Sequence, residues 1–172
     1  ALYIEDVLAR LPVGLVGPVA VKAGPSGLDP EAWLTSFQAI IAEIPGGIEA
    51  VAVAYADNTE ASCLPPEEVL ESAARCGART VLIDTFDKSG PGLLERVDAT
   101  VLQGWVEQAH RHRLSLALAG KLTPTDVVVA TSLGADVVGV RSAACDGGRL
   151  GRVDPVRVRA LGRLIADCRV PG

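Results

Sequence analysis

The chain has 172 residues, of which 49% are hydrophobic and 22% are charged, and its formal net charge is −5. This composition indicates one globular domain with a real core and excludes a disordered chain. Because the net charge is acidic and no basic stripe is interleaved with aromatic residues, we expect no nucleic-acid partner. No apolar run reaches the roughly 18 residues of a membrane span, and no signal peptide is visible, so we expect a cytoplasmic protein without a membrane partner.

Cysteine and histidine are too few and too scattered to predict a metal site. The four cysteines form no Cys-x-x-Cys pair and are Cys63, Cys76, Cys145 and Cys168. They are interpreted as reduced thiols of a cytosolic protein. His110 and His112 fall at the end of a predicted helix, where the helix dipole favours a cation, so we predict a structural role for both. We expect neither a metal ion nor a cofactor.

The predicted elements begin with a short helix near residues 3–11. Five strands follow, each rich in Val, Ala, Ile or Leu and bounded by turn residues, at 17–24, 48–57, 79–86, 114–120 and 135–143. None of them alternates cleanly between polar and apolar residues. Continuous apolar runs of this kind are typical of parallel strands that are buried on both faces.

Helices with recognisable start signals lie between and after these strands. The residues that open them are Asp29-Pro30, Pro65-Pro66, Asp98, Thr123-Pro124 and Asp154-Pro155. Asp and Thr are good N-cap residues, and proline suits the first turn. Gly77 and Gly134 stand where two of these helices are expected to end.

The order of the elements, strand then helix repeated five times, predicts parallel βαβ units. Right-handed crossovers leave two architectures, an open doubly wound sheet or a barrel. No Gly-x-Gly-x-x-Gly follows the first strand, which argues against a dinucleotide site. A closed barrel needs eight strands, so a barrel places about three further βα units upstream. The absence of any methionine agrees with that expectation.

Polar residues gather where the predicted strands end. In chain order they are Lys22, then Tyr55 and Asp57, then Asp84, Asp87 and Lys88, then Lys121, and finally Arg141. Ligands of parallel βα folds bind at the carboxyl ends of the strands. We therefore expect the functional site at this edge of the sheet.

The use of lysine indicates what chemistry this edge supports. Arginine outnumbers lysine 13 to 3, and all three lysines, Lys22, Lys88 and Lys121, follow strands. A lysine can lose its proton, whereas an arginine effectively cannot, and a neutral amine can form an imine or remove a proton. This pattern favours chemistry on an aldehyde or ketone, with Lys22 and Lys88 ahead of Lys121. The alternative is that the lysines extend to solvent or pair with a carboxylate such as Asp84.

Two loops after the last strands have features of a phosphate site. Glycines let backbone N–H groups approach an anion, and arginine binds phosphate through two parallel bonds. The candidate phosphate-binding residues are Gly120, Lys121, Gly139, Arg141, Gly147 and Gly148. In barrels, phosphate often lies on the loops after strands seven and eight. The alternative is a flexible turn with a surface arginine.

Several short runs, in this order, resemble the (5-formylfuran-3-yl)methyl phosphate synthase family, also called 4-(hydroxymethyl)-2-furancarboxaldehyde-phosphate synthase. The resemblance covers most of the chain. It rests on Val21-Lys22-Ala23-Gly24, Tyr55-Ala56-Asp57, Asp84-Thr85 with Lys88, Ala117-Leu118-Ala119-Gly120, and Gly139-Val140-Arg141-Ser142-Ala143-Ala144-Cys145-Asp146-Gly147-Gly148. The last run is the most specific of these.

The resemblance implies a TIM (β/α)₈-type barrel, a Schiff-base lyase that condenses two molecules of glyceraldehyde 3-phosphate in methanofuran biosynthesis. It implies that Lys22 is the proton acceptor, and that Asp84 and Lys88 are a polar pair that assists enolisation, aldol addition and elimination. In this interpretation Asp84 keeps Lys88 protonated as a donor, while Lys22 is the base. We expect residues 1–172 to be a single domain, the C-terminal portion of a full barrel with about five βα units present.

One motif of the resembling family is missing. The family's imine-forming lysine lies in an Asp-x-Lys motif on an early strand, and no such motif precedes Lys22. We expect a chain of five strands to associate with other copies, because it leaves two sheet edges open. Two other functions remain open: another imine-forming aldolase on a phosphate-binding barrel, and a non-catalytic phosphate-binding paralogue.

Overall fold

The computed structural model describes residues 19–169. The predicted helix near residues 3–11 and the first two residues of the first predicted strand lie outside this range. The strands and helices are β1 (Val19–Ala23), α2 (Pro30–Glu43), β2 (Ile48–Tyr55), α3 (Pro66–Arg75), β3 (Thr80–Asp84), α4 (Leu93–Arg96), α5 (Ala99–Arg111), β4 (Ser115–Leu118), α6 (Pro124–Ser132), β5 (Val137–Val138), β6 (Cys145–Asp146), β7 (Arg152–Val153) and α7 (Pro155–Arg169).

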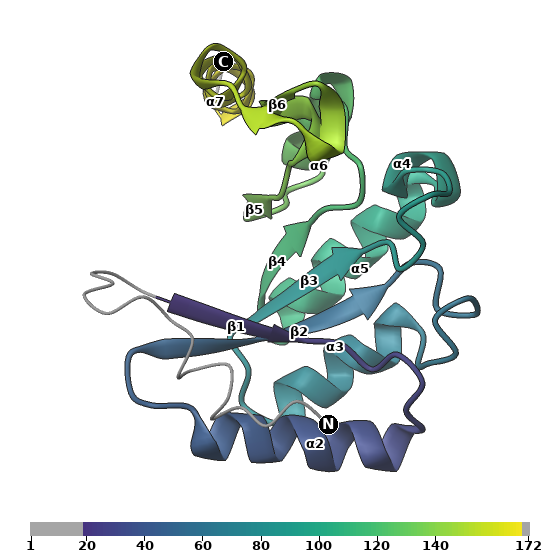
Figure 1. Cartoon of the computed structure of the whole chain (residues 1–172). Helices are drawn as coiled ribbons and strands as arrows, with labels where there is room; N and C mark the ends of the chain where they lie inside the picture. The colour runs from purple at the N-terminus through teal and green to yellow at the C-terminus, as the bar shows by residue number, and fades with distance from the viewer. Residues whose placement is uncertain (1–18, 170–172) are drawn as a thin grey trace.

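The five predicted strands form one parallel sheet in the order β1-β2-β3-β4-β5, as the alternation of strands and helices predicted (Figure 1). The register places Lys22 beside Val51 and Tyr55 beside Asp84. Since the strands are parallel, their carboxyl ends lie at one edge, and the loops that follow them lie side by side. Within the described residues, β1 and β5 are the outer strands of this sheet.

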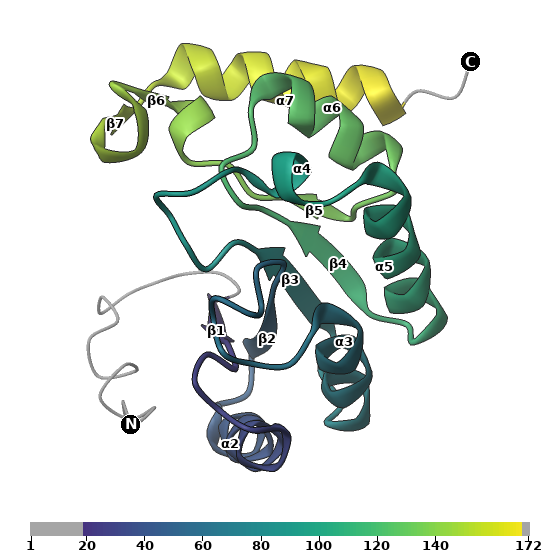
Figure 2. The ribbon, with the colours of Figure 1, turned by 90° about the vertical axis from the view of Figure 1, so that its right-hand side faces the viewer.

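The core lies between one face of the curved sheet and the helices packed on it (Figure 2). Ala50, Ala52 and Ala54 of β2 alternate onto this face and are buried. Their small side chains let the large residues of α2, Trp33 and Phe37, which stack at 4.9 Å, approach the sheet. This alternation positions the intervening residues, including Tyr55, on the other face.

The prediction that the strands are buried on both faces is wrong for part of the sheet. Val51 and Leu82, which alternate away from the core, are only half-buried, and Val137 is 52% exposed. Among the helices of the described range, α2, α3, α5 and α6 pack on the core face of the sheet (Figure 2). The continuous apolar runs are therefore those of barrel-type strands, in which the second face of each strand points toward the barrel interior. They are not those of strands that lie between two layers of helices.

The helix starts were predicted well, with one exception. Asp29 accepts a hydrogen bond from the N–H of Ala32 at 2.8 Å, and Thr123 forms a capping box with Asp126. The side chain of Asp98 makes no capping bond, contrary to the prediction. The helix begins there because the Asp98 carbonyl accepts the first helical hydrogen bonds, from Val101 and Leu102.

The segment after β4 differs most from the predicted elements. β5 contains only Val137–Val138 instead of residues 135–143, and Arg141 precedes a 3₁₀ turn at Ser142–Ala144 rather than ending a strand. The short helix α4 and the β6–β7 hairpin were not predicted. Elements of two to four residues carry too little hydrophobic periodicity to be recognised. None of the helices in the described range is long and apolar enough to span a membrane.

Candidate active site

A small cavity opens at the carboxyl ends of β1, β2 and β3, where the sequence predicted the functional site. Its volume is about 280 Å³, and it is lined by Lys22, Gly24, Val53, Tyr55, Asp84, Phe86 and Lys88. All three residues predicted to be catalytic are among them. Two amines, a carboxylate and a phenol therefore face one space that suits a small substrate.

Asp84 and Lys88 form an ion pair at the lip of this cavity. The Nζ of Lys88 lies 2.8 Å from Oδ1 of Asp84 and also donates to the carbonyl of Thr85. The same Oδ1 accepts the N–H of Thr85 at 2.8 Å. Asp84 ends β3 and Lys88 follows on the loop, so the pair forms only if the loop turns back over the strand end.

Lys22 lies on β1 and is exposed. Its partner in the sheet register, Val51, offers no charge. Within residues 19–169, its ammonium group makes no ion pair, unlike that of Lys88. Three strands and the loop after β3 thus supply the polar groups of the cavity. Among the described residues, the Lys88 amine has a carboxylate partner and the Lys22 amine has none.

Tyr55 is the cavity residue that the sequence analysis noted at a strand end without predicting a role. Burial raises the pKa of the Tyr55 phenol most, and the neighbouring Asp84, Cys63 and Asp57 raise it further, so the hydroxyl stays protonated at neutral pH. Its ring meets Phe86 edge to face at 5.4 Å. The Tyr-Ala-Asp run at the end of a buried strand was the sequence feature that pointed to it.

Gly24 is the residue that leaves room for Tyr55. A Cβ atom at this position would lie 2.7 Å from the Tyr55 hydroxyl oxygen. The φ angle of Gly24 is not in the left-handed region, so the glycine is required by the close approach of the phenol and not by the backbone. The Val-Lys-Ala-Gly run thus carries both an amine and a gap for the neighbouring tyrosine.

The Gly120–Lys121 loop lies beside the loop after β3. The carbonyl of Gly120 accepts the N–H of Leu93 at 2.9 Å, and the Lys121 Nζ donates to the carbonyl of Gly90. Gly120 has φ +107°, and an added Cβ would lie 3.0 Å from Thr85. Lys121 is exposed and is not among the residues that line the cavity.

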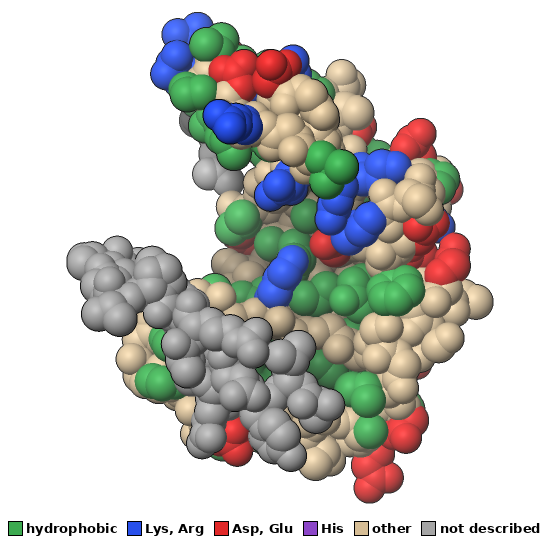
Figure 3. All heavy atoms as spheres, viewed as in Figure 1, with side chains coloured by type: hydrophobic (Ala, Val, Ile, Leu, Met, Phe, Trp, Pro, Cys, Tyr) green, Lys and Arg blue, Asp and Glu red, His purple; other side chains and the backbone are tan. Residues whose placement is uncertain are grey.

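The remaining candidate phosphate residues follow β5, and they do not line the cavity either. Gly139 donates its N–H to the carbonyl of Leu118 at 2.8 Å. Arg141 is exposed, and its Nε donates to the carbonyl of Arg149 at 2.9 Å. Gly147 and Gly148 are exposed, with φ +78° and +73°. In the view of Figure 3, most of the visible Lys and Arg side chains lie in the upper half of the molecule, around a hollow near its centre.

The sheet, its helix-covered face and the position of the cavity define a TIM-barrel-type α/β fold. Two solved structures share it. The thiamine phosphate pyrophosphorylase of Pyrococcus furiosus has a TM-score of 0.62 and 16% identity, over 98% of this chain and 66% of its own. The 3-hexulose-6-phosphate synthase of Salmonella typhimurium has a TM-score of 0.57 and 16% identity, over 88% of this chain and 63% of its own.

The chain belongs to the 4-HFC-P synthase family, whose family model matches residues 7–162. The (5-formylfuran-3-yl)methyl phosphate synthase of Methanosarcina acetivorans is 29% identical over 167 residues, 95% of this chain and 70% of that protein. The enzyme of the same name from Methanopyrus kandleri is 37% identical over 118 residues, 67% of this chain and 50% of that protein.

The chain is shorter than the curated relatives it matches. A relative from Kitasatospora aureofaciens is 34% identical over 168 residues, which are 92% of this chain and 66% of that protein. The matched part of the chain thus spans between 50% and 70% of the length of these relatives. Within residues 19–169, no group of three or more His, Cys, Asp or Glu side chains is placed to hold a metal ion.

Proposed function

We propose that the protein containing this chain is a (5-formylfuran-3-yl)methyl phosphate synthase. Two molecules of glyceraldehyde 3-phosphate would condense to the furan phosphate, releasing one phosphate and two molecules of water, in methanofuran biosynthesis. Family membership supports the reaction. The observation that carries the assignment of the site is the single cavity shared by Lys22, Asp84 and Lys88.

The cavity supplies the acid and base groups that such a condensation needs. In the proposal, Lys22 removes a proton from a carbon next to a carbonyl, because its amine has no carboxylate partner among the described residues. Lys88, whose Nζ is 2.8 Å from Asp84, donates a proton to an oxygen as the carbon–carbon bond forms and as water leaves. The neutral Tyr55 hydroxyl adds a hydrogen-bond donor that does not change charge at neutral pH.

The phosphate groups would lie on the neighbouring loops. Gly120, Lys121, Gly139, Arg141, Gly147 and Gly148 remain the candidates for this contact. Their support is the positive φ of Gly120, Gly147 and Gly148 and the basic side chains of Lys121 and Arg141, on loops that follow β4 and β5 of the same parallel sheet. Because Lys22 and Lys88 are both assigned to proton transfer, an imine would form on a further lysine that does not line this cavity.

Incubating the full-length protein with glyceraldehyde 3-phosphate tests this proposal. We expect an ultraviolet absorbance from a furan aldehyde and a mass equal to two substrate molecules less one phosphoric acid and two waters. Lys22→Gln and Lys88→Gln should each lower the rate of this signal by about 100-fold or more, in the range of general acid–base contributions. Arg111→Gln, on the exposed end of α5, serves as the charge-loss control.

Two further measurements, borohydride trapping and substrate binding, separate this proposal from the other two functions. Trapping of the substrate by borohydride without a furan product would replace the proposal with an imine-forming aldolase. Substrate binding without turnover, even with substrate in excess, would replace it with a phosphate-binding paralogue.

A further inference from the structure

The loop between β3 and α4, residues 85–92, is held by a buried carboxylate of the preceding βα loop. Asp57 follows β2, and its side chain is 0% exposed. Its Oδ1 accepts the N–H of Phe86 at 2.6 Å, and its Oδ2 accepts the N–H of Asp87 at 2.9 Å. Hydrogen bonds to an ionised carboxylate are short and strong, and more so away from water. The start of the loop is therefore fixed to the end of the neighbouring strand.

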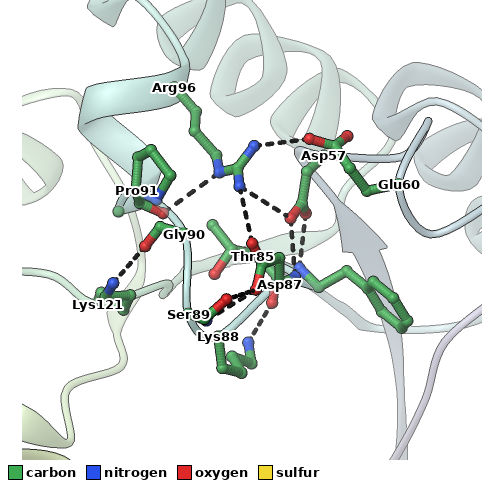
Figure 4. A network of polar contacts seen from close by, with 12 residues as sticks. Asp57, Glu60, Thr85, Asp87, Lys88, Ser89, Gly90, Pro91, Arg96 and Lys121 are labelled. Carbon is green, nitrogen blue, oxygen red and sulfur yellow. Dashed lines mark hydrogen bonds and ion pairs between the residues drawn. The ribbon is translucent and has the colours of Figure 1, made fainter.

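Arg96 closes this arrangement from the other end of the loop (Figure 4). Its Nη2 lies 3.7 Å from a carboxylate oxygen of Asp57 and 3.7 Å from one of Asp87. Its Nε donates to the carbonyl of Pro91 at 3.3 Å. The fourth partner is Glu60, 2.9 Å from Nη1, whose side chain is 52% exposed. The guanidinium thus neutralises Asp57 and ties it to the far side of the loop.

The backbone at Gly90 lies directly against this pair. A Cβ atom at residue 90 would be 2.5 Å from the Arg96 guanidinium and 2.5 Å from the Asp87 carboxylate. The carbonyl of the same glycine accepts from Lys121. The loop that carries Lys88 is therefore closely packed on Arg96 and in contact with one candidate phosphate residue.

We propose that Asp57 is a positioning residue, which sets the place of Lys88 by holding the two amides that precede it in the loop. Lys88 directly follows Asp87, and its Nζ must reach Asp84, at 2.8 Å, and the cavity. Without Asp57, the N–H groups of Phe86 and Asp87 lose their acceptor, and the loop loses its attachment to β2. The consequence for turnover rests on the proposed function of Lys88, whereas the consequence for the loop does not.

The test compares Asp57→Asn with the matched control Glu60→Gln in the full-length protein. Both changes remove a carboxylate partner of Arg96, but only the first replaces one of the two oxygens that accept the loop amides with an NH₂ group, which cannot accept a hydrogen bond. Amide hydrogen exchange in the absence of substrate reports the loop directly. Turnover of glyceraldehyde 3-phosphate reports the position of Lys88.

In Asp57→Asn we expect the amides of Phe86 and Asp87 to exchange roughly tenfold faster or more, with the amides of β4 unchanged. We expect kcat to fall by about tenfold or more while KM changes less than about threefold, because binding residues elsewhere are untouched. In Glu60→Gln both properties should stay within about twofold of the unmodified protein.

Unchanged exchange of these amides in Asp57→Asn would overturn the proposal, whatever the activity. Faster exchange with full turnover would overturn it as well. A protein that makes no furan product disproves the proposed function, and the exchange result still decides whether Asp57 holds the loop. Gly90→Ala gives a second approach if Asp57→Asn does not fold, because its Cβ displaces Arg96 and Asp87 and should produce the same faster exchange and lower kcat.

Discussion

Replacing Gly24 with alanine tests whether the position of Tyr55 matters for turnover. The added Cβ would lie 2.7 Å from the Tyr55 hydroxyl oxygen, whereas ordinary contact begins at 3.4 Å. The phenol must therefore move by roughly 0.7 Å, and a misplacement of about 1 Å in an active site can cost on the order of 100-fold in rate. We expect Gly24→Ala to lower kcat/KM by about 10- to 100-fold, or about 1.4–2.7 kcal/mol of transition-state stabilisation.

Tyr55→Phe distinguishes the contribution of the Tyr55 hydroxyl to turnover from that of its ring. One hydrogen bond contributes about 0.5–1.5 kcal/mol, so its loss should lower kcat/KM by about two- to twelvefold. In the Tyr55→Phe background, the nearest atoms to a Cβ at residue 24 are ring carbons at 3.0 Å. The alanine then displaces the ring less, and the two changes should cost less together than the sum of their separate effects.

The assay is the furan absorbance with glyceraldehyde 3-phosphate, with thermal unfolding as the check on folding. Because Tyr55 is only half-buried, Gly24→Ala should lower the unfolding midpoint by no more than about 2–4 °C, which is about 1 kcal/mol for a chain of this size. Gly104→Ala on α5 is the control, since its Cβ would meet nothing within 4 Å. A Gly24→Ala protein with full kcat/KM would refute the reasoning that Tyr55 must occupy its present place.

Three further predictions concern stability. Thr85 is 0% exposed, and its hydroxyl has no hydrogen-bond partner among the residues the structure describes. Thr85→Val should therefore raise the free energy of unfolding by about 1 kcal/mol in a denaturant titration. A lower free energy of unfolding would mean that the hydroxyl is hydrogen-bonded. Leu116 is 0% exposed in the core, so Leu116→Ala should cost about 3–5 kcal/mol, and a cost below about 1 kcal/mol would contradict its place there. Burial acts to raise the pKa of Asp136, but the N–H of Leu116 and the ring of His110 outweigh it and lower that pKa below 3.8. The stability this carboxylate contributes is present above its ordinary pKa and is lost as pH falls through the lowered one. As pH falls from the ordinary pKa of an Asp to the lowered pKa of Asp136, the denaturant midpoint should fall less steeply for Asp136→Asn than for the unmodified protein. An equal dependence of the midpoint on pH in the two proteins would contradict the lowered pKa.

The order and type of the main elements could be predicted because the information is local. Each apolar run is bounded by its own turn residues, and helix starts such as Asp29-Pro30 are recognisable from two or three neighbouring positions. Parallel strands place their carboxyl ends at one edge, so the topology alone was enough to bring Lys22, Asp84 and Lys88 together. These three residues indeed line one cavity.

Contacts between distant segments could not be predicted in the same way. Whether Tyr55 lies against Gly24 depends on the register of β2 against β1 and on the space that only a glycine leaves there. The candidate phosphate residues were predicted from composition, and the sequence could not say that they lie outside the cavity walls. A side chain's reach across a sheet edge is a property of the packed backbone rather than of sequence spacing.

The sequence by itself determined a parallel βα fold whose polar edge carries Lys22, Asp84 and Lys88 among other charged residues, because hydrophobic periodicity and capping residues act locally. Only the tertiary structure decided that Asp57 holds the Lys88 loop, because its bonds to Phe86 and Asp87 join residues 29 and 30 positions apart. It also decided that the second sheet face is partly open, because burial depends on which elements pack there and not on the apolar run alone. The physical reason is the same in both cases: long-range contacts are set by the three-dimensional arrangement of strands and loops, which no local pattern encodes.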